Sequence, residues 1–201
     1  MLLSINPEHP EPRKVRRAVD LLEAGQVIAY PTDTSYGIGC DLFNKRAIDR
    51  VYQIRQLPEK HQLSFICPDL SDIARYAIVD NSQYRLLKRL LPGPYTFILE
   101  ATREVPKIVQ SKKKTVGIRV PNNEVVLAMV RELGRPIVST TAAPSGGDPM
   151  IDPDEIDEMF SGLALVLDAG VGGSVPTTIV DLTGGEVRVV REGAGPVDEL
   201  G

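Results

Sequence analysis

Segments with the repeat of an amphipathic helix alternate with short apolar runs along most of the 201-residue chain. Residues 12–24 place Val15, Val19 and Leu22 on one helical face, and residues 26–30 follow as an apolar strand. Such alternation predicts an α/β protein, with helices packed around a twisted β-sheet. Further helices are expected at residues 44–55, 69–76, 81–91 and 122–133 and from Asp152 onward, and further strands at residues 63–67, 95–101, 115–120, 136–140, 163–167 and 177–182.

The last predicted strand leads into a β-hairpin, which decides the type of sheet. Residues 177–182 turn through Thr183, Gly184 and Gly185 into residues 186–191. Because this antiparallel pair lies beside strands that are separated by helices, we expect a mixed sheet. The chain has no internal repeat and no long linker, so the sequence predicts a single domain over all 201 residues.

The composition is that of an ordinary globular protein, with 42% hydrophobic and 25% charged residues. No apolar run approaches the roughly 20 residues of a membrane span, so no membrane partner is expected. The N-terminal segment MLLSINPEHPEP has neither the basic region nor the long apolar segment of a secretory signal. The expected location is therefore cytoplasmic.

The net charge of −4 hides an asymmetry between the two parts of the chain. Residues 1–120 hold 19 Lys and Arg against 13 Asp and Glu, whereas residues 121–201 hold 4 against 14. An affinity of the whole chain for nucleic acid is therefore not expected, but a local cationic surface or cleft is. The alternative is a dipole between two solvated faces that bind no partner.

Cysteine and histidine are too sparse and too scattered to predict a zinc site. The two cysteines, Cys40 and Cys67, do not form a CxxC motif, and the two histidines are His9 and His61. Each cysteine adjoins an apolar or glycine-containing strand end, so a reduced and partly buried thiol is expected at both positions.

Three predicted strands end in polar loops that contain glycine: residues 31–39 (PTDTSYGIG), 139–147 (STTAAPSGG) and 168–178 (DAGVGGSVPTT). In open α/β sheets, ligands bind where strands end and backbone amides are free, so these loops predict a small polar pocket. The alternative is that they only form turns, in which Ser, Thr and Gly are common. Neither GxxxxGK[ST] nor GxGxxG occurs in the chain, so the usual nucleotide-binding motifs are absent.

Arginines at the ends of predicted strands indicate an anionic ligand. Arg119 in GIRVP and Arg191 in VVREG follow apolar residues, where a guanidinium group needs a carboxylate or phosphate partner. The alternative is an internal ion pair with one of the 27 acidic residues. The run Lys112, Lys113 and Lys114 is expected to be a solvated loop that could close over an anion.

Six segments occur in the order in which they are found in the YrdC/YciO family: PTDTSYGIGCD, LPGPYTFIL, KTVGIRVP, PIVSTTAAPSGG, VPTTIVDL and VVREG. The chain resembles this family over about residues 12–195. The resemblance implies a twisted mixed sheet wrapped around a large concave cleft. It also implies a link to threonylcarbamoyl-AMP synthases, which combine threonine, bicarbonate and ATP, release pyrophosphate and serve the modification of adenosine in tRNA.

The resemblance assigns residues to two parts of a binding site. Thr34 and Arg119 would hold the amino acid, with Arg119 paired to its carboxylate. Such chemistry needs positioning and charge stabilisation more than a protein nucleophile. Mg²⁺ would accompany ATP through phosphate oxygens and water. The nucleotide and its phosphates would be lined by Arg55, Thr115, Ser139, Thr141 and Arg191, with Thr177 where the family usually has serine.

Several positions depart from the synthase pattern. Leu57 replaces the second cation of the family's KxR motif, and Ala143 replaces the asparagine of its STSAN loop. Ile66 stands where a histidine is frequent, and His61 occupies a polar position before it. Losing a charge-assisted phosphate contact and an amide weakens binding of ATP or of the transition state. The departures match the YciO branch, which the segments IRQLPEKHQL, VDN, REVP and PTT also resemble.

Three functional interpretations follow from these residues. The first is a nucleotide-binding enzyme that makes threonylcarbamoyl-AMP or acts on it in another direction. The second is a protein that binds tRNA or double-stranded RNA through a cationic surface that includes Lys112, Lys113 and Lys114, without synthase activity. The third is a retained fold with altered small-molecule specificity.

Overall fold

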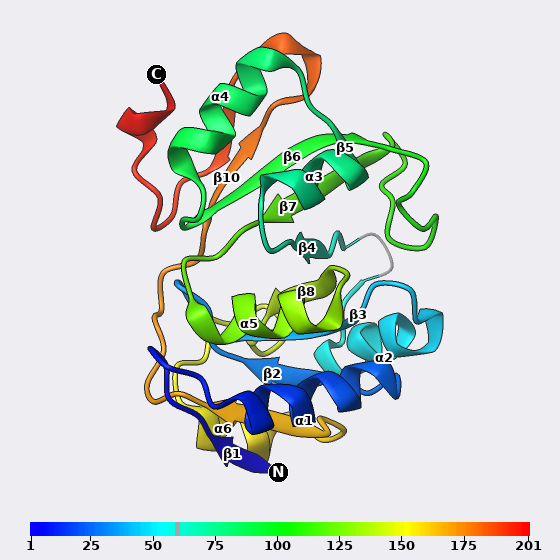
Figure 1. The fold of residues 1–201 in the computed structure, drawn as a ribbon, viewed down its shortest axis with the longest axis vertical. Coiled ribbons are helices and arrows are strands. Elements are labelled where there is room, and N and C mark those ends of the chain that lie inside the picture. Colours follow the sequence, from blue (N-terminus) through cyan, green and yellow to red (C-terminus); the bar gives the residue numbers. More distant parts are fainter. Residues whose placement is uncertain (59–60) are drawn as a thin grey trace.

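The computed structural model describes residues 1–58 and 61–201, and Figure 1 shows how its elements are arranged. Within those residues, eleven strands form one twisted mixed sheet and six α-helices pack against it, so the predicted α/β architecture is confirmed. The strand order is β1-β9-β2-β3-β8-β4-β7-β6-β10-β11, and β5 pairs with β6. The helices are α1 (Pro12–Glu23), α2 (Lys45–Arg55), α3 (Leu70–Tyr76), α4 (Asn81–Leu90), α5 (Glu124–Leu133) and α6 (Pro153–Met159). The strands are β1 (Leu2–Ser4), β2 (Ile28–Tyr30), β3 (Gly37–Asp41), β4 (Ser64–Ile66), β5 (Ala77–Ile78), β6 (Tyr95–Ala101), β7 (Thr115–Arg119), β8 (Ile137–Thr141), β9 (Leu165–Asp168), β10 (Thr178–Asp181) and β11 (Arg188–Arg191).

Helices α1 and α5 lie side by side over one face of the sheet (Figure 1). In β2, Ile28 and Tyr30 pack with these helices, whereas Ala29 and the preceding Val27 pack into a larger core that includes residues of α2 and α6. Successive residues of β2 are therefore buried on both faces, as in a strand that is covered on both sides. The predicted apolar face of α1 is confirmed, and its buried residues are Val15, Ala18, Val19 and Leu22.

The sequence predicts Asn122 as the N-cap of α5 and Gly134 as the glycine after its end, but the helix begins one residue later than this cap implies. Its N-cap is Asn123, whose side-chain oxygen accepts a hydrogen bond from the Val126 main-chain nitrogen at 3.2 Å, so the predicted cap at Asn122 is wrong. The main-chain nitrogen of Asn122 instead donates to the Asp33 carboxylate at 3.0 Å. The expected glycine after the helix is confirmed, because Gly134 adopts a left-handed conformation with φ of 70°.

Strand β3 overlaps residues 31–39, which the sequence predicts to be a polar loop. Its glycines make room for Tyr30 of β2, whose ring lies against β3 while its hydroxyl reaches Ser139 on β8. A Cβ atom on Gly39 would lie 2.4 Å from the Val138 carbonyl oxygen and 2.6 Å from the Tyr30 hydroxyl. The glycines of β3 therefore allow neighbouring strands to approach closely. Because glycine is unfavourable in strands, the residue types of this segment do not predict a strand.

The predicted C-terminal hairpin is confirmed. Strand β10 pairs antiparallel with β11 and parallel with β6, which makes the sheet mixed. The pairing shifts register between Ile179 and Val180, so that Ile179 lies opposite Arg191 and Val180 opposite Val189. This irregularity fixes the position of Arg191 at the end of β11.

Other expectations from the sequence concern thiols, metals and membranes. Cys40 and Cys67 are free cysteines that are fully buried, where the sequence predicts partly buried thiols, and burial raises the pKa of both. Across the described residues, no group of His, Cys, Asp and Glu side chains could hold a metal ion. None of the helices in the described part of the chain is long and apolar enough to cross a membrane.

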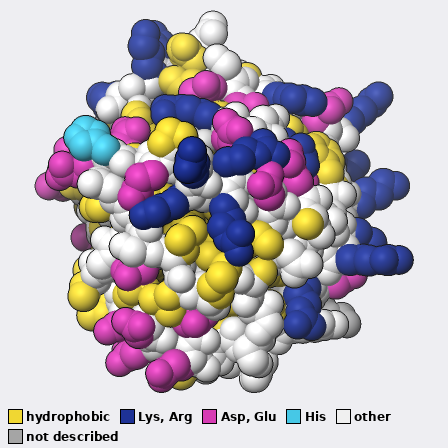
Figure 2. All heavy atoms as spheres, turned by 60° about the horizontal axis from the view of Figure 1, so that its bottom comes forward, with side chains coloured by type: hydrophobic (Ala, Val, Ile, Leu, Met, Phe, Trp, Pro, Cys, Tyr) yellow, Lys and Arg dark blue, Asp and Glu magenta, His cyan; other side chains and the backbone are white. Residues whose placement is uncertain are grey.

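Basic and acidic side chains are mixed over the face of the molecule that Figure 2 shows. Helix α1 contributes to this mixture, because Arg16 forms ion pairs with Asp20, Glu23 and Glu132 at 2.7, 2.8 and 3.2 Å. Part of the positive charge of the first 120 residues is thus neutralised at the surface. This face therefore does not form the cationic surface that the sequence predicts.

Candidate ligand-binding site

A cavity of about 400 Å³, called the first cavity below, opens where β7, β8, β10, β11 and the end of α2 come together. Two of the three loops that the sequence predicts at a pocket contribute to it, residues 139–147 and 168–178, whereas no residue of the loop 31–39 is among the described residues of its wall. The described residues that line the first cavity are Arg55, His61, Gln62, Ser64, Thr96, Arg119, Ser139, Thr140, Thr141, Ala143, Gly147, Pro149, Pro176, Thr177, Ile179 and Arg191.

Three arginines from separate elements share the first cavity: Arg55 ends α2, Arg119 ends β7 and Arg191 ends β11. No acidic residue is found among the described residues of its wall. Several guanidinium groups around one hollow create a positive potential that attracts carboxylates and phosphates. The wall is therefore suited to an anionic ligand.

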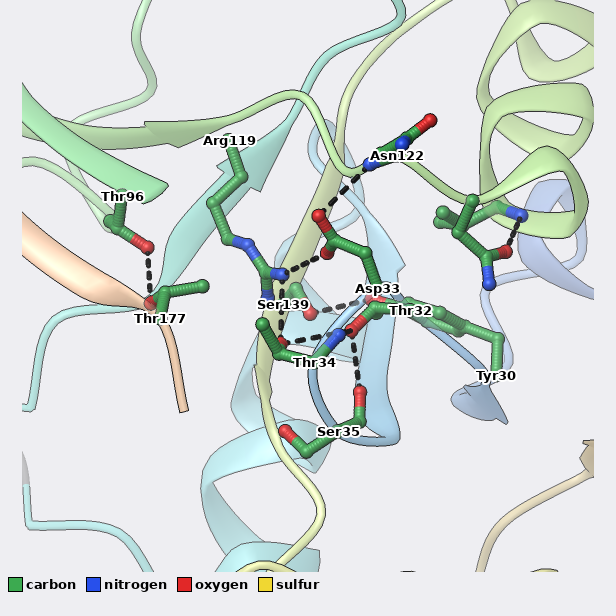
Figure 3. A network of polar contacts seen from close by, with 12 residues as sticks. Tyr30, Thr32, Asp33, Thr34, Ser35, Thr96, Arg119, Asn122, Ser139 and Thr177 are labelled. Carbon is green, nitrogen blue, oxygen red and sulfur yellow. Dashed lines mark hydrogen bonds and ion pairs between the residues drawn. The ribbon is translucent and has the colours of Figure 1, made fainter. Parts of the chain in front are cut away.

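Arg119 is held by a buried carboxylate behind the cavity wall (Figure 3). Its Nη2 atom donates to Asp33 Oδ1 at 3.0 Å and to Thr34 Oγ1 at 3.1 Å, and the side chains of Arg119 and Asp33 are 10% and 9% exposed. The internal ion pair that the sequence leaves open is thus present at Arg119. The Nε atom of Arg119 is buried and has no hydrogen-bond partner among the described residues. Burial lowers the pKa of this guanidinium, and Asp33 opposes the shift.

The turn that carries Asp33 and Thr34 is closed by its own hydroxyl groups (Figure 3). Thr32 Oγ1 donates to the Ser35 carbonyl at 2.6 Å and accepts from the Thr34 main-chain nitrogen at 3.2 Å. The loop before β10 covers this turn so closely that a Cβ atom on Gly173 would lie 1.9 Å from the Thr34 carbonyl oxygen. The polar residues of the stretch therefore fix the position of Arg119.

Arg55 has a different environment, without a carboxylate partner among the described residues. Its Nε atom donates to the Thr141 carbonyl at 2.8 Å, and its guanidinium lies 5.6 Å from the centre of the Phe160 ring. The Nη1 atom is buried and finds no partner in the described part of the chain. Burial lowers the pKa of Arg55 because it disfavours the charged guanidinium. An anion in the cavity would compensate this charge and give the Nη1 atom a partner.

Arg191 is oriented by a backbone oxygen. Its Nη2 atom donates to the Thr177 carbonyl at 2.8 Å, and the Thr177 hydroxyl forms a hydrogen bond with the Thr96 hydroxyl at 2.8 Å (Figure 3). Close packing of Gly193 holds the segment after β11 against this loop, since a Cβ atom there would lie 2.2 Å from the Pro176 carbonyl oxygen. Partial burial lowers the pKa of Arg191 as well.

Ser139 supplies a hydroxyl group that can donate a hydrogen bond to a ligand. The Tyr30 hydroxyl donates to Ser139 Oγ at 2.6 Å, so the Ser139 hydroxyl keeps its own hydrogen to donate into the cavity. Burial raises the pKa of Tyr30, which keeps the phenol protonated as this donor.

The structure brings together most, but not all, of the site residues that the sequence analysis names. Thr34 is buried behind Arg119 and is not among the described residues of the cavity wall. Thr115 lies with Lys112 and Lys113 in a second cavity of about 480 Å³, and Lys114 is exposed in the turn before β7. The named residues that meet in the first cavity are Arg55, Arg119, Ser139, Thr141, Thr177 and Arg191.

The four residues that depart from the synthase pattern lie in different environments. Leu57 packs against the main apolar core, and Ile66 packs in the core below α1 and α5. Ala143 lines the first cavity, so the missing amide would have faced a ligand there. His61 lines both cavities.

Sequence reasoning does not identify Asp33 and Thr96 as members of the site. Asp33 lies in the quoted segment PTDTSYG, but its partner Arg119 is 86 residues away, and only the fold pairs them. Thr96 alternates with apolar residues in YTFIL, where an inward-facing hydroxyl cannot be told from an outward-facing one without the position of the strand.

Comparison with known proteins identifies the family. A family model named Sua5_yciO_yrdC, with the description "Telomere recombination", matches residues 20–193. YciO of Escherichia coli is 43% identical over 196 residues, which cover 96% of this chain and 95% of YciO. The crystal structure of E. coli YciO matches with a TM-score of 0.94 at 41% identity, covering 100% of this chain and 98% of that one.

Enzymes of the same family are more distant. A threonylcarbamoyl-AMP synthase of Methylobacillus flagellatus is 34% identical over 178 residues, which cover 87% of this chain and 99% of the synthase. P. abyssi Sua5, crystallised in complex with L-threonine, matches with a TM-score of 0.93 at 27% identity, and the match covers 100% of this chain but 59% of Sua5. The chain therefore belongs to the Sua5/YciO/YrdC family, as its motifs predict, and is more similar to YciO than to the synthase.

Proposed function

We propose that this protein binds an adenylate that carries a threonine-like group, of the type of threonylcarbamoyl-AMP, in the first cavity. The proposal depends on one observation: Arg55, Arg119 and Arg191 line the same cavity, and none of the described residues of its wall is acidic. Phosphate and carboxylate are the groups that guanidinium donors recognise in pairs. The threonine complex of Sua5 and the name of the synthase relative agree with such a ligand.

The roles follow from the two kinds of environment in the cavity. Arg119, fixed by Asp33, would pair with the carboxylate of the amino acid through its free Nε atom. Arg55 and Arg191, which lack a carboxylate partner among the described residues, would pair with phosphate oxygens. Thr141 and Thr177 would add hydroxyl donors beside the phosphates.

Synthesis would require attack of a threonine carbamate oxygen on the α-phosphorus of ATP, with pyrophosphate as the leaving group. The arginines would stabilise the negative charge that grows on the phosphoryl oxygens. The described part of the cavity wall offers hydroxyl and amide oxygens but no carboxylate. Mg²⁺ would therefore enter with ATP, held by phosphate oxygens and water.

Because of Leu57 and Ala143, we expect slow synthesis of threonylcarbamoyl-AMP. Leu57 packs on the core and brings no charge to the polyphosphate, and Ala143 leaves the cavity wall without an amide. Each missing charged hydrogen bond is worth about 1.5–3 kcal/mol. We expect the double variant Leu57→Arg, Ala143→Asn to release pyrophosphate faster than the original chain in the presence of threonine, bicarbonate and ATP.

Calorimetric titration with AMP tests the proposal itself. We expect AMP to bind, and Arg191→Ala to weaken binding by roughly 10-fold to 100-fold, as the loss of one charge-assisted hydrogen bond implies. Arg85→Ala, on the exposed side of α4, serves as the matched control and should leave the affinity unchanged. Absence of AMP binding at millimolar concentration, or equal affinities of the two variants, would contradict the proposal.

RNA binding is a second candidate, and the second cavity favours it. Lys112, Lys113 and Arg188 line this cavity, which shares His61 and Gln62 with the first. Phosphates of an RNA backbone would pair with these cations. Binding of tRNA or double-stranded RNA should then weaken steeply between 50 and 200 mM salt, by roughly 10-fold or more. An affinity that does not change with salt would exclude this function.

A further inference from the structure

His61 and Gln62 are the only described residues that line both cavities, so a ligand that extends from one to the other passes them. The main chain of His61 is held in place from two sides. Its nitrogen donates to the Pro58 carbonyl at 2.8 Å, and its carbonyl accepts from the Tyr52 hydroxyl at 2.5 Å. The imidazole therefore has a fixed point of attachment at the junction of the cavities.

The charged groups on both sides of His61 are mostly cationic. Arg55, Arg119 and Arg191 line the first cavity. On the side of the second cavity are Lys112, Lys113, Arg188 and Asp181, of which Asp181 accepts a hydrogen bond from Arg188 at 2.6 Å. Burial and the nearby charge of Arg55 lower the pKa of His61 below its usual value. Both effects favour the uncharged imidazole when no ligand is bound.

An anionic ligand reverses this balance. Its negative charge offsets the arginines and gives an imidazolium a partner, which favours the protonated form of His61. The residue would then supply a positive charge to the first cavity, which Leu57 does not line. A neutral imidazole at the same place would accept or donate hydrogen bonds but would add no charge.

We propose that His61 is a proton-coupled ligand contact, which takes up one proton from solvent when an anion binds in the first cavity. This inference rests on the proposed function and adds a specific binding residue and a pH dependence to it. The proton comes from the buffer, forms an N–H bond with the imidazole and returns to the buffer when the ligand leaves, and no bond between heavy atoms changes. Because the ligand-bound form of His61 holds its proton to a higher pH than the free form, affinity rises as pH falls between those two values.

The effect is measured by titrating AMP into the protein at pH 6 and pH 8 by calorimetry. We expect the His61 contribution to tighten AMP binding roughly 3-fold to 10-fold at pH 6, since each unit of pKa difference corresponds to a factor of ten. AMP itself gains a proton near pH 6. In the variant His61→Asn, residue 61 cannot be charged, so any pH dependence of its affinity comes from AMP. This variant should show a smaller pH dependence than the original chain.

Two more variants separate the charge of His61 from its shape. His61→Lys carries a permanent charge and should bind AMP tightly at both pH values. His9→Asn changes the other histidine of the chain, which is exposed in the N-terminal segment, and should keep the full pH dependence. Titration in two buffers with different ionisation enthalpies should show proton uptake by the original chain that His61→Asn lacks.

The outcomes distinguish this inference from the proposed function. If the original chain and His61→Asn both bind AMP with the same pH dependence and proton uptake, the role of His61 is refuted and the proposed function stands. If the original chain does not bind AMP at either pH, both fail. If His61→Asn lacks the native circular dichroism spectrum, His61→Gln takes its place. We expect His61→Gln to show the same reduced pH dependence and the same lack of proton uptake.

Discussion

At the scale of single residues, the site depends on how one buried charge is compensated. Arg119 meets Asp33 in surroundings where neither side chain is more than 10% exposed. Removing one partner of such a pair leaves the other charge buried and uncompensated. Asp33 is also the acceptor for the Asn122 main-chain nitrogen, so it connects the turn after β2 to the segment before α5.

The variant Asp33→Asn should therefore be destabilised. We expect a loss of about 3 kcal/mol in the free energy of unfolding in denaturant, because the charge of Arg119 loses its partner. Asp20→Asn is the control, since Asp20 pairs with Arg16 at the exposed surface and should cost less than about 1 kcal/mol. Saturating AMP should recover part of the loss in Asp33→Asn. Equal stabilities of the two variants would show that Asp33 does not compensate Arg119.

The sequence predicts the chemistry of this site better than its pairings. Arg119 and Arg191 can be singled out because each charge follows apolar strand residues. The partner of Arg119 cannot be chosen from the sequence, because 27 acidic residues are available and the fold decides which one is near. Thr115 likewise resembles a nucleotide contact but lies in the second cavity.

At the scale of elements, the packing of β2 against β3 determines where the cavity wall lies. Tyr30 reaches from β2 across β3 to Ser139 on β8, and it can do so because β3 has glycine at positions 37 and 39. Helices are predicted well in this chain, since a buried face repeats along each of them. Strand β3 is predicted poorly because its glycines serve tertiary contacts, and the short strands β1 and β5 carry too few residues for a pattern.

The variant Gly39→Ala tests this account of β3. Its new Cβ atom would lie 2.4 Å from a main-chain oxygen, which cannot move away without displacing β8. We expect a loss of about 1–3 kcal/mol in the free energy of unfolding. Gly117→Ala in β7 is the matched control, because its Cβ atom would meet a Thr96 methyl group at 3.4 Å and fits with little change. A Gly39→Ala variant as stable as Gly117→Ala would contradict the account.

At the scale of the whole molecule, an acidic protein contains a cationic cavity. The net charge is −4, yet three arginines face one hollow where strands from different parts of the sheet meet. Surface cations such as Arg16 are paired with carboxylates, whereas Arg55 and Arg191 use backbone oxygens. Two of the cavity arginines, Arg55 and Arg119, belong to the first 120 residues, whose excess of positive charge predicts a local cationic cleft.

A ligand that joins these elements should stabilise the entire fold. At 100 times its dissociation constant, AMP should add about 2.7 kcal/mol to the free energy of unfolding. For a domain of this size, the melting temperature should rise by roughly 5–10 °C. Adenosine, which lacks the phosphate, should produce a much smaller shift at the same concentration. Equal shifts with AMP and adenosine would show that the arginines do not bind the phosphate.

The central claim is that the guanidinium groups of Arg55, Arg119 and Arg191 act on one anion-binding site. A crystal structure of the protein with AMP tests it most directly. We predict the phosphate of AMP in the first cavity, within hydrogen-bonding distance of at least two of these three groups. A phosphate bound elsewhere, for example at Lys112 and Lys113 in the second cavity, would contradict the claim.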